Sequence, residues 1–199
     1  MRVFTVLKSG GQYKPEHVQW FQRMSYEKCS AEFVCLSDMK VPGVEIIPLK
    51  RNWPGWWSKI ELFQYSDVLY FDLDTVIINN IDYMLDLKGF NALRNPTSKR
   101  SLAATMSMAS GIMAWDHPPI GVYEGFDKRL IPQYNTRKAW GDQGYIATKT
   151  RYTPLQDTFP GRIKSYKYEL MNKEKPNCDI VVYHGRPKPW DTKHKWLPK

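Results

Sequence analysis

Residues 68–78 of the chain read Val-Leu-Tyr-Phe-Asp-Leu-Asp-Thr-Val-Ile-Ile, an apolar run of β-forming residues interrupted by two carboxylates, Asp72 and Asp74. This composition favours a buried strand. Side chains two positions apart on a strand share a face, so the two carboxylates can converge on one point. Carboxylates that close repel unless a proton or a cation lies between them. The stretch therefore predicts either a site for a hard cation such as Mg²⁺ or Mn²⁺, or a strand end with two capping or turn aspartates.

The segments before this strand predict an α/β fold, in which strands alternate with helices. The predicted strands are residues 2–7, 32–36 and 44–49, and the predicted helices are residues 15–29 and 58–66. This alternation indicates a mostly parallel central sheet flanked by helices, and the length suits a single domain over residues 1–199. Ligands of such open sheets gather at the carboxyl ends of the strands, where Asp72 and Asp74 are expected.

The second half of the chain continues the pattern with shorter elements. Strands are predicted at residues 109–115, 163–168 and 179–183, helices from 118 to 126 and from 141 to 148, a polar loop at 95–101 and irregular structure at 129–138. No internal repeat and no linker between domains is visible.

Composition and charge limit the classes of partner. Hydrophobic residues make up 42% of the 199 residues and charged residues 25%, which is typical of a globular protein. The net charge is +9, and residues 151–199 hold eleven Lys and Arg against five Asp and Glu. This surplus favours an anionic partner: a nucleotide diphosphate, nucleic acid or an acidic membrane surface. The basic tail from about residue 186 is compatible with guiding an acidic acceptor, with peripheral contact with an anionic membrane surface, or with ordinary solvation.

Cysteine usage and the absence of long apolar runs bear on localisation. The three cysteines form no Cys-x-x-Cys pair and are odd in number, which favours free thiols in a reducing compartment. The first residues have too short an apolar core for a signal peptide, and no apolar run approaches the roughly 20 residues that span a bilayer. We therefore predict a cytoplasmic protein.

Residues 184–190 read His-Gly-Arg-Pro-Lys-Pro-Trp and follow an apolar strand, as Asp72 follows residues 68–71. His184 and Asp72 are therefore expected on the same rim of the sheet. Gly185 permits a close approach of the backbone, and Arg186 and Lys188 supply cations. A metal between two carboxylates and an imidazole, beside a lysine, would make a site for a diphosphate. A histidine at a strand end is also commonly structural.

Four segments in this order resemble the family 8 glycosyltransferases and their GT-A-fold relatives. The segments are residues 69–74, 110–113, 141–143 and 184–190, and the last is the most specific. The resemblance implies a compact GT-A domain that transfers a sugar from a nucleotide-sugar, with UDP as the expected nucleotide, to an acceptor of unknown identity (a glycan, a lipid-linked sugar or a protein). It also implies retention of anomeric configuration, by front-face attack or through a covalent intermediate on Asp142.

The resemblance assigns roles to the residues of the carboxylate strand and of the C-terminal motif. Asp72, Asp74 and His184 are expected to bind Mn²⁺ or Mg²⁺ across the phosphates of the donor. Lys188 and the backbone of Gly185 are expected to hold the diphosphate.

Further roles are implied for residues elsewhere in the chain. Asp142 and Gln143 match the place where the family positions the sugar and the acceptor near the anomeric carbon. The remaining donor contacts implied are Leu7 and Ser9 near the uracil, Tyr13 stacking on it, Lys59 approaching the donor and Ser110 touching the sugar. Structural alternatives stand beside these roles: a loop tyrosine for Tyr13, a helix N-cap for Asp142, a solvated helix residue for Lys59 and packing for Ser110.

Two other functions compete with sugar transfer. Residues 71–76 resemble the opening of haloacid-dehalogenase phosphatases, with Asp72 as nucleophile and Asp74 as acid/base, but that family needs a downstream acidic pair and residues 141–143 supply one acid. A basic nucleic-acid-binding protein would suit the charge, but no RNA-binding motif is present, and two acids in an apolar strand would be out of place. We therefore expect no nucleic-acid partner.

Overall fold

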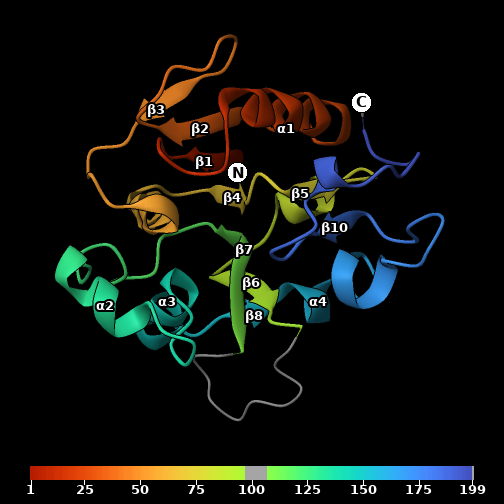
Figure 1. Cartoon of the computed structure of the whole chain (residues 1–199). Coiled ribbons are helices and arrows are strands. Elements are labelled where there is room, and N and C mark those ends of the chain that lie inside the picture. The colour runs from red at the N-terminus through yellow and green to blue at the C-terminus, as the bar shows by residue number, and fades with distance from the viewer. Residues whose placement is uncertain (97–106, 199) are drawn as a thin grey trace.

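The computed structural model describes residues 1–96 and 107–198. The described residues form a seven-stranded sheet in the order β3-β2-β1-β4-β7-β6-β8 and a three-stranded sheet in the order β5-β10-β9 (Figure 1). In the larger sheet β7 runs antiparallel to both neighbours, and the other adjacent pairs are parallel. The mostly parallel α/β fold predicted from the sequence is confirmed. Of the loop predicted at 95–101, residues 97–101 lie outside the described residues.

The described residues form strands, α-helices and other short helices. The strands of the larger sheet are β1 (Arg2–Leu7), β2 (Phe33–Ser37), β3 (Ile46–Pro48), β4 (Val68–Phe71), β6 (Asn91–Arg94), β7 (Met108–Trp115) and β8 (Thr153–Pro154). The smaller sheet contains β5 (Thr75–Ile77), β9 (Ile163–Ser165) and β10 (Ile180–Val182). The α-helices are α1 (Pro15–Lys28), α2 (Ile131–Tyr134), α3 (Asp142–Lys149) and α4 (Leu155–Thr158). The 3₁₀-helices are η1 (Gly55–Gln64), η2 (Asp82–Met84), η5 (Lys128–Leu130) and η7 (Pro189–Asp191), and η6 (Tyr166–Leu170) is a π-helix.

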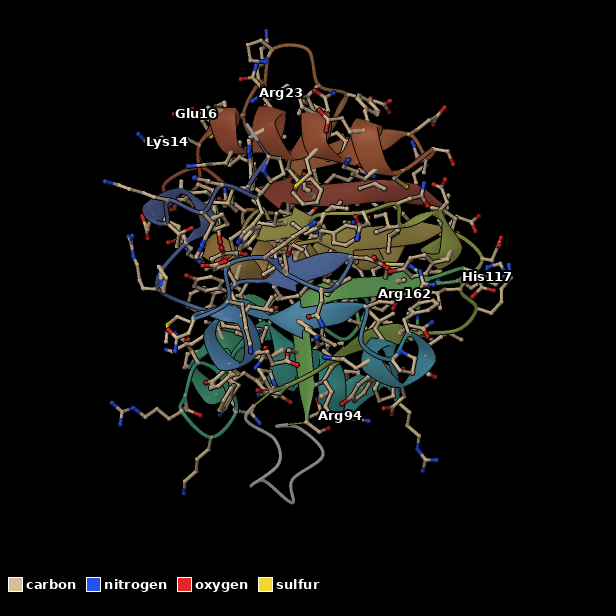
Figure 2. All side chains as sticks on the ribbon, turned by 90° about the vertical axis from the view of Figure 1, so that its right-hand side faces the viewer. Lys14, Glu16, Arg23, Arg94, His117 and Arg162 are labelled. Carbon is tan, nitrogen blue, oxygen red and sulfur yellow. The ribbon has the colours of Figure 1, made fainter. Side chains whose placement is uncertain are left out.

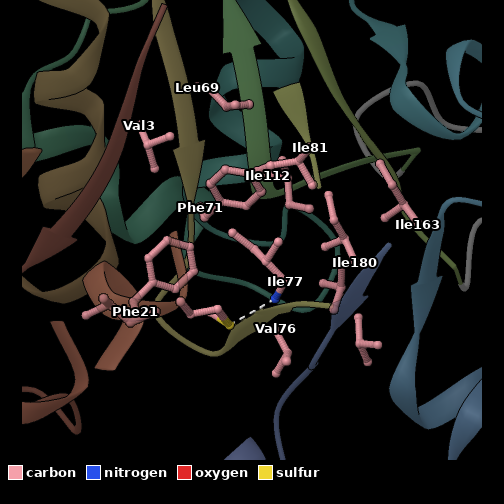
Figure 3. Packing of buried hydrophobic residues seen from close by; sticks show 14 of the residues in the cluster. Val3, Phe21, Leu69, Phe71, Val76, Ile77, Ile81, Ile112, Ile163 and Ile180 are labelled. Carbon is pink, nitrogen blue, oxygen red and sulfur yellow. Dashed lines mark hydrogen bonds between the residues drawn. The ribbon is translucent and has the colours of Figure 1, made fainter. Parts of the chain in front are cut away.

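Two hydrophobic cores cover the two faces of the larger sheet, because successive strand residues point to opposite faces. On β4, Leu69 and Phe71 join a core with α1 and the smaller sheet, whereas Val68 and Tyr70 join a core with η1 and α3. Figure 1 shows α1, β5 and β10 on one side and α2 and α3 on the other. Figure 3 shows the first of these cores, where the Ile77 amide donates to the Met24 sulfur at 3.1 Å.

The apolar run over residues 68–78 forms two strands, and Asp72 and Asp74 lie in the turn at the end of the first, as in the strand-end alternative. β4 ends at Phe71, and a turn in which the Thr75 amide donates to the Asp72 carbonyl at 2.9 Å carries the chain into the smaller sheet. β5 leaves because its partner there is β10, with Val76 opposite Val181. Asp72 and Asp74 therefore flank a turn instead of sharing a strand face, but they do lie at the carboxyl end of β4 as expected.

Other differences concern helices. The residues predicted as a helix from 58 to 66 form the 3₁₀-helix η1, and those predicted as a helix from 118 to 126 form turns. The segment 129–138, predicted to be irregular, contains α2, and the strand predicted at 163–168 ends at Ser165, where η6 begins. These are short segments in which tertiary contacts outweigh weak local preferences.

The molecular surface carries most of the charge. Figure 2 shows Glu16 and Arg23 on α1, and Arg94 on β6, at the periphery, and all three are exposed. Trp196 and Leu197 pack against the core beside α1, and the Trp20 indole donates to the Pro198 carbonyl at 3.1 Å. Within residues 1–96 and 107–198, no helix is both long and apolar enough to cross a bilayer.

Candidate active site

Asp72 is the first residue after β4, and side chains from three other elements gather around it. Lys59 on η1 donates to Asp72 Oδ1 at 2.9 Å and lies 3.3 Å from Oδ2 of Asp142 on α3. Ser110 on β7 accepts from Lys59 Nζ at 3.3 Å and donates to Asp142 Oδ2 at 2.7 Å. We call Lys59, Asp72, Ser110 and Asp142 the Asp72 network. It joins residues that the sequence placed in four separate segments.

The strand register explains why these elements meet at Asp72. Tyr70 and Asp72 are two positions apart, so both point to the face that η1 and α3 cover, and the Tyr70 hydroxyl donates to Asp72. The Asp72 amide donates to the Gly111 carbonyl at 2.8 Å, and a Cβ at Gly111 would lie 3.4 Å from Asp72 Oδ2. The glycine of β7 thus brings its strand close to the carboxylate.

Burial makes the charges of this network interdependent. The Lys59 residue is 4% exposed. Burial lowers the pKa of Lys59, but the charges of Asp142 and Asp72 outweigh burial and raise the pKa above its ordinary value. Burial and the charge of Asp72 also raise the pKa of the Tyr70 hydroxyl well above its ordinary value. Lys59 therefore remains a cation, and Tyr70 remains a hydrogen-bond donor.

Asp74 has a different partner, because it lies beyond the turn. Lys188, in the C-terminal loop, donates to Asp74 Oδ2, and both side chains are only 6% exposed. Lys188 Nζ also donates to the Tyr13 hydroxyl at 3.2 Å. Burial and the charge of Asp72 raise the pKa of Asp74, against the opposing effect of Lys188. Burial, together with the charges of Asp74 and Asp72, raises the pKa of Tyr13, which stays protonated.

His184 lies beside the same charges and is half-buried. Burial lowers its pKa, the charge of Asp72 opposes this, and Lys188 and Lys167 lower it further. The imidazole is therefore neutral at pH 7, which is its metal-binding form. The prediction that His184 and Asp72 follow strands of one sheet is wrong, because β10 belongs to the smaller sheet.

The predicted metal site combines carboxylate oxygens with an imidazole nitrogen. These atom types fit Mn²⁺ or Mg²⁺. Three aspartates, Asp72, Asp74 and Asp142, pair with two lysines, so the group has one more negative charge than positive. Among the described residues, however, no three His, Cys, Asp or Glu side chains are grouped so that they could hold a metal ion. Lysines already pair with Asp72 and Asp74, so Asp72, Asp74 and His184 as metal ligands stay a prediction.

A cavity of about 340 Å³ opens beside these residues. Three of the predicted donor contacts, Tyr13, Lys59 and Asp72, line it, together with Lys8 and Trp56. Lys59 is buried, not a solvated helix residue. Tyr13 is half-buried and packs edge-on against Trp190, with ring centroids 6.0 Å apart.

The other predicted residues lie around this cavity in different ways. The Leu7 side chain is fully buried in the core, and neither it nor Ser9 is among the described residues that line the cavity. The Ser9 amide and hydroxyl donate to Asp38 at 2.8 and 2.6 Å. Gly185 is exposed with φ of 66°, which glycine adopts readily. Gln143 and Asp142 line a second cavity. The N-cap of α3 is Gly141, so Asp142 is not the N-cap.

Three residues of this region were not expected from the sequence. Tyr70 donates to Asp72, Asp38 fixes the loop after β1, and Trp56 lines the cavity. Tyr70 could have been found from its spacing of two before Asp72, and Asp38 from its place just after β2. Trp56 could not have been found, because residues 53–57 have no periodicity that would show which of their tryptophans is exposed.

Comparison with known proteins shows the fold more clearly than the sequence does. No protein-family model matches the chain, and no curated protein matches it. Solved structures do match. Glycosyltransferase GlyE of Streptococcus pneumoniae TIGR4 matches with a TM-score of 0.65 and 15% identity, over 96% of this chain and 56% of GlyE. The chain thus spans about half the length of GlyE.

Two further glycosyltransferases match over nearly the whole chain. Galactosyltransferase LgtC, solved with donor and acceptor sugar analogs, matches with a TM-score of 0.61 and 12% identity, over 96% of this chain and 89% of LgtC. The bifunctional WbbM matches with a TM-score of 0.55 and 13% identity, over 96% of this chain and 46% of WbbM. At these identities the likeness concerns the fold, and the GT-A-like fold implied by the sequence resemblance is confirmed. This chain has the fold of these glycosyltransferases.

Proposed function

We propose that this protein is a glycosyltransferase that takes a sugar from a nucleotide-sugar, with UDP as the expected nucleotide. The observation that carries the proposal is the meeting of Asp72, Asp74 and Asp142 with Lys59 and Lys188 at the carboxyl end of β4, beside the 340 Å³ cavity. A site with both acids and lysines suits a sugar diphosphate, in which an anionic leaving group and a positively charged sugar centre develop together.

The two lysines are the groups proposed to act on the leaving diphosphate. Both are buried, so their charge acts in a medium of low dielectric constant, where each interaction with a developing anion is stronger than in water. Lys188 reaches the site from the C-terminal loop, and its pairing with Tyr13 orients it toward the loop after β1. The first strand and this loop are proposed to bind the base, with Tyr13 against it.

Asp142 and Gln143 are proposed to face the anomeric carbon. Lys59 and Ser110 fix Asp142 Oδ2, so this carboxylate needs little rearrangement to stabilise the positive charge of an oxocarbenium-like transition state. Retention is proposed from the resemblance, and either front-face attack or a covalent intermediate on Asp142 would produce it.

A divalent ion belongs to the proposal through Asp72, Asp74 and His184. When bound, Mn²⁺ or Mg²⁺ would neutralise charge on the donor phosphates. Lys188 already pairs with Asp74 Oδ2, so the ion and this ammonium would compete for the charge of one carboxylate. In this proposal Lys188 would also supply a positive charge to the diphosphate.

A thermal-denaturation screen of nucleotide-sugars, with and without Mn²⁺, tests the proposed function. At a concentration about 100 times the dissociation constant, a true donor stabilises the fold by about 2.7 kcal/mol, which raises Tm by about 5–10 °C. Oligonucleotides and phosphomonoesters serve as controls for the two competing functions. Stabilisation by these controls and by no nucleotide-sugar would reject sugar transfer.

A further inference from the structure

A second cavity, of about 750 Å³, adjoins the first and shares a wall with it. Trp56 lines both cavities, and Asp142 of the Asp72 network lines the second. The second cavity is also lined by Asn135, Arg137, Trp140 and Gln143. A molecule in either cavity would therefore contact Trp56, and one in the second cavity would also contact Asp142.

Trp56 is exposed although its neighbours are firmly packed. The side chain is 56% exposed, whereas Trp57 is 2% exposed and stacks on Phe126 with ring centroids 5.1 Å apart. The Ser58 hydroxyl donates to the Gly55 carbonyl at 2.7 Å and closes this first turn of η1. Trp56 is thus presented from a rigid turn, and its indole face loses little freedom when a ligand covers it.

The wall of the second cavity contains two indole N–H groups, from Trp56 and Trp140. Among the described residues, none accepts a hydrogen bond from Trp56 Nε1, which lies against the backbone of Gly141, where a Cβ would be 3.0 Å away. Trp140, the residue before, has a φ of 61°, and its buried Nε1 also has no hydrogen-bond partner among the described residues. A residue held in a sparsely populated backbone conformation at a cavity wall, as Trp140 is, is common at ligand-binding sites.

We infer that this second cavity binds the acceptor, and that the acceptor presents a pyranose ring whose C–H face stacks on Trp56. A pyranose combines an apolar face with a rim of hydroxyl groups, which matches an exposed indole bordered by Arg137, Asn135 and Gln143. An aliphatic chain would leave these polar groups unpaired. This inference rests on the proposed function, because it assigns the acceptor class of the same site.

The first experiment reads binding without any turnover. The eight tryptophans are replaced with 5-fluorotryptophan. The variants Trp56→Phe and Trp140→Phe assign the ¹⁹F resonances of these two residues. A panel of methyl glycopyranosides is then titrated in the presence of UDP. We expect at least one glycoside to shift both resonances and to leave that of the fully buried Trp115 unchanged. No shift with any glycoside would overturn the inference, and so would shifts with octyl glycosides only, which would indicate an apolar ligand.

The second experiment compares Trp56→Ala with Tyr26→Ala, a matched control whose aromatic ring on α1 is 57% exposed. Trp56→Ala should raise the acceptor KM, or the glycoside Kd, about tenfold, whereas Tyr26→Ala should leave it unchanged and Trp56→Phe should give a smaller loss. Equal effects of Trp56→Ala and Tyr26→Ala would contradict the stacking role. If glycosides shift the Trp56 resonance but no nucleotide-sugar binds, the proposed sugar transfer is rejected and the saccharide site is supported. If a nucleotide-sugar binds but no glycoside does, the saccharide site is rejected and the proposed sugar transfer is supported.

Discussion

Lys188 pairs with Asp74, a residue 114 positions earlier in the chain, and both side chains are almost completely buried. This ion pair joins the C-terminal loop to the turn between β4 and β5. It also means that the carboxylate expected to bind a metal already has a cation. The pair therefore links stability, metal binding and donor binding, and each of these can be measured.

The first prediction concerns the stability of this pair. Lys188→Met leaves the Asp74 carboxylate buried and unpaired, which should lower the free energy of unfolding by about 3–5 kcal/mol. Adding Asp74→Asn to Lys188→Met should restore part of the loss, because the unpaired charge is then gone. Urea denaturation measures all three variants. Removing Arg94 from its exposed pair with Asp157 is the control and should cost less than about 1 kcal/mol.

The second prediction follows from competition between Lys188 and a metal ion for Asp74. Lys188→Met should bind Mn²⁺ more tightly than the unmodified protein in the absence of donor, because no ammonium has to be displaced. The same variant should bind UDP more weakly, because Lys188 is proposed to hold the diphosphate. Calorimetric titration separates the two affinities, with the exposed Lys193→Met as control. If both affinities fell together, Lys188 and the metal would not share Asp74.

The third prediction concerns the proposed metal ligands. Asp74→Asn and His184→Ala should abolish donor turnover while both variants remain folded, and chelation with EDTA should abolish turnover of the unmodified protein. Asp157→Asn and His117→Ala are matched controls, because both residues are exposed and lie outside the Asp72 network. Circular dichroism and product analysis on the same samples check the result. Near-normal turnover in either ligand variant would remove the metal site from the proposal.

The fourth prediction is a pH dependence at Asp38, which anchors the loop after β1. Partial burial raises the pKa of Asp38, but hydrogen bonds from Lys8 and Ser9 outweigh it and lower the pKa to about 2. Because the folded pKa lies below that of the unfolded chain, the contribution to stability is complete above about pH 5 and is lost as the pH falls from about 4 to about 2.

The stability difference between the unmodified protein and Asp38→Asn should follow this course. It should be about 1–2 kcal/mol at neutral pH, after allowance for partial exposure of the Asp38 side chain, and should fall to a small remainder at about pH 2 and vanish below it. Denaturant titrations at a series of pH values measure it. A difference that did not change between pH 2 and pH 5 would show that Asp38 is not held by these bonds.

Local pattern predicted the elements with strong periodicity. The strand from Arg2 to Leu7 has the predicted bounds, and α1 ends one residue before the predicted Cys29. Both elements were predictable because the spacing of their apolar residues shows which side of the element is buried. For the run from Val68 to Ile78, local pattern left open whether the aspartates share a strand or lie in a turn. Its composition suits burial throughout, but composition does not tell whether one sheet or two provides the partners, and β10, far along the chain, takes the second half.

The sequence by itself determined that Asp72 and His184 each follow an apolar strand, and that carboxylates and lysines are available near them. Only the tertiary structure decided the pairs: Lys59 with Asp72 and Asp142, Lys188 with Asp74, and Trp56 between two cavities. Periodicity reports which face of an element a side chain takes. Which other element covers that face depends on packing across the whole chain, and buried charges take the partners that this packing brings within reach.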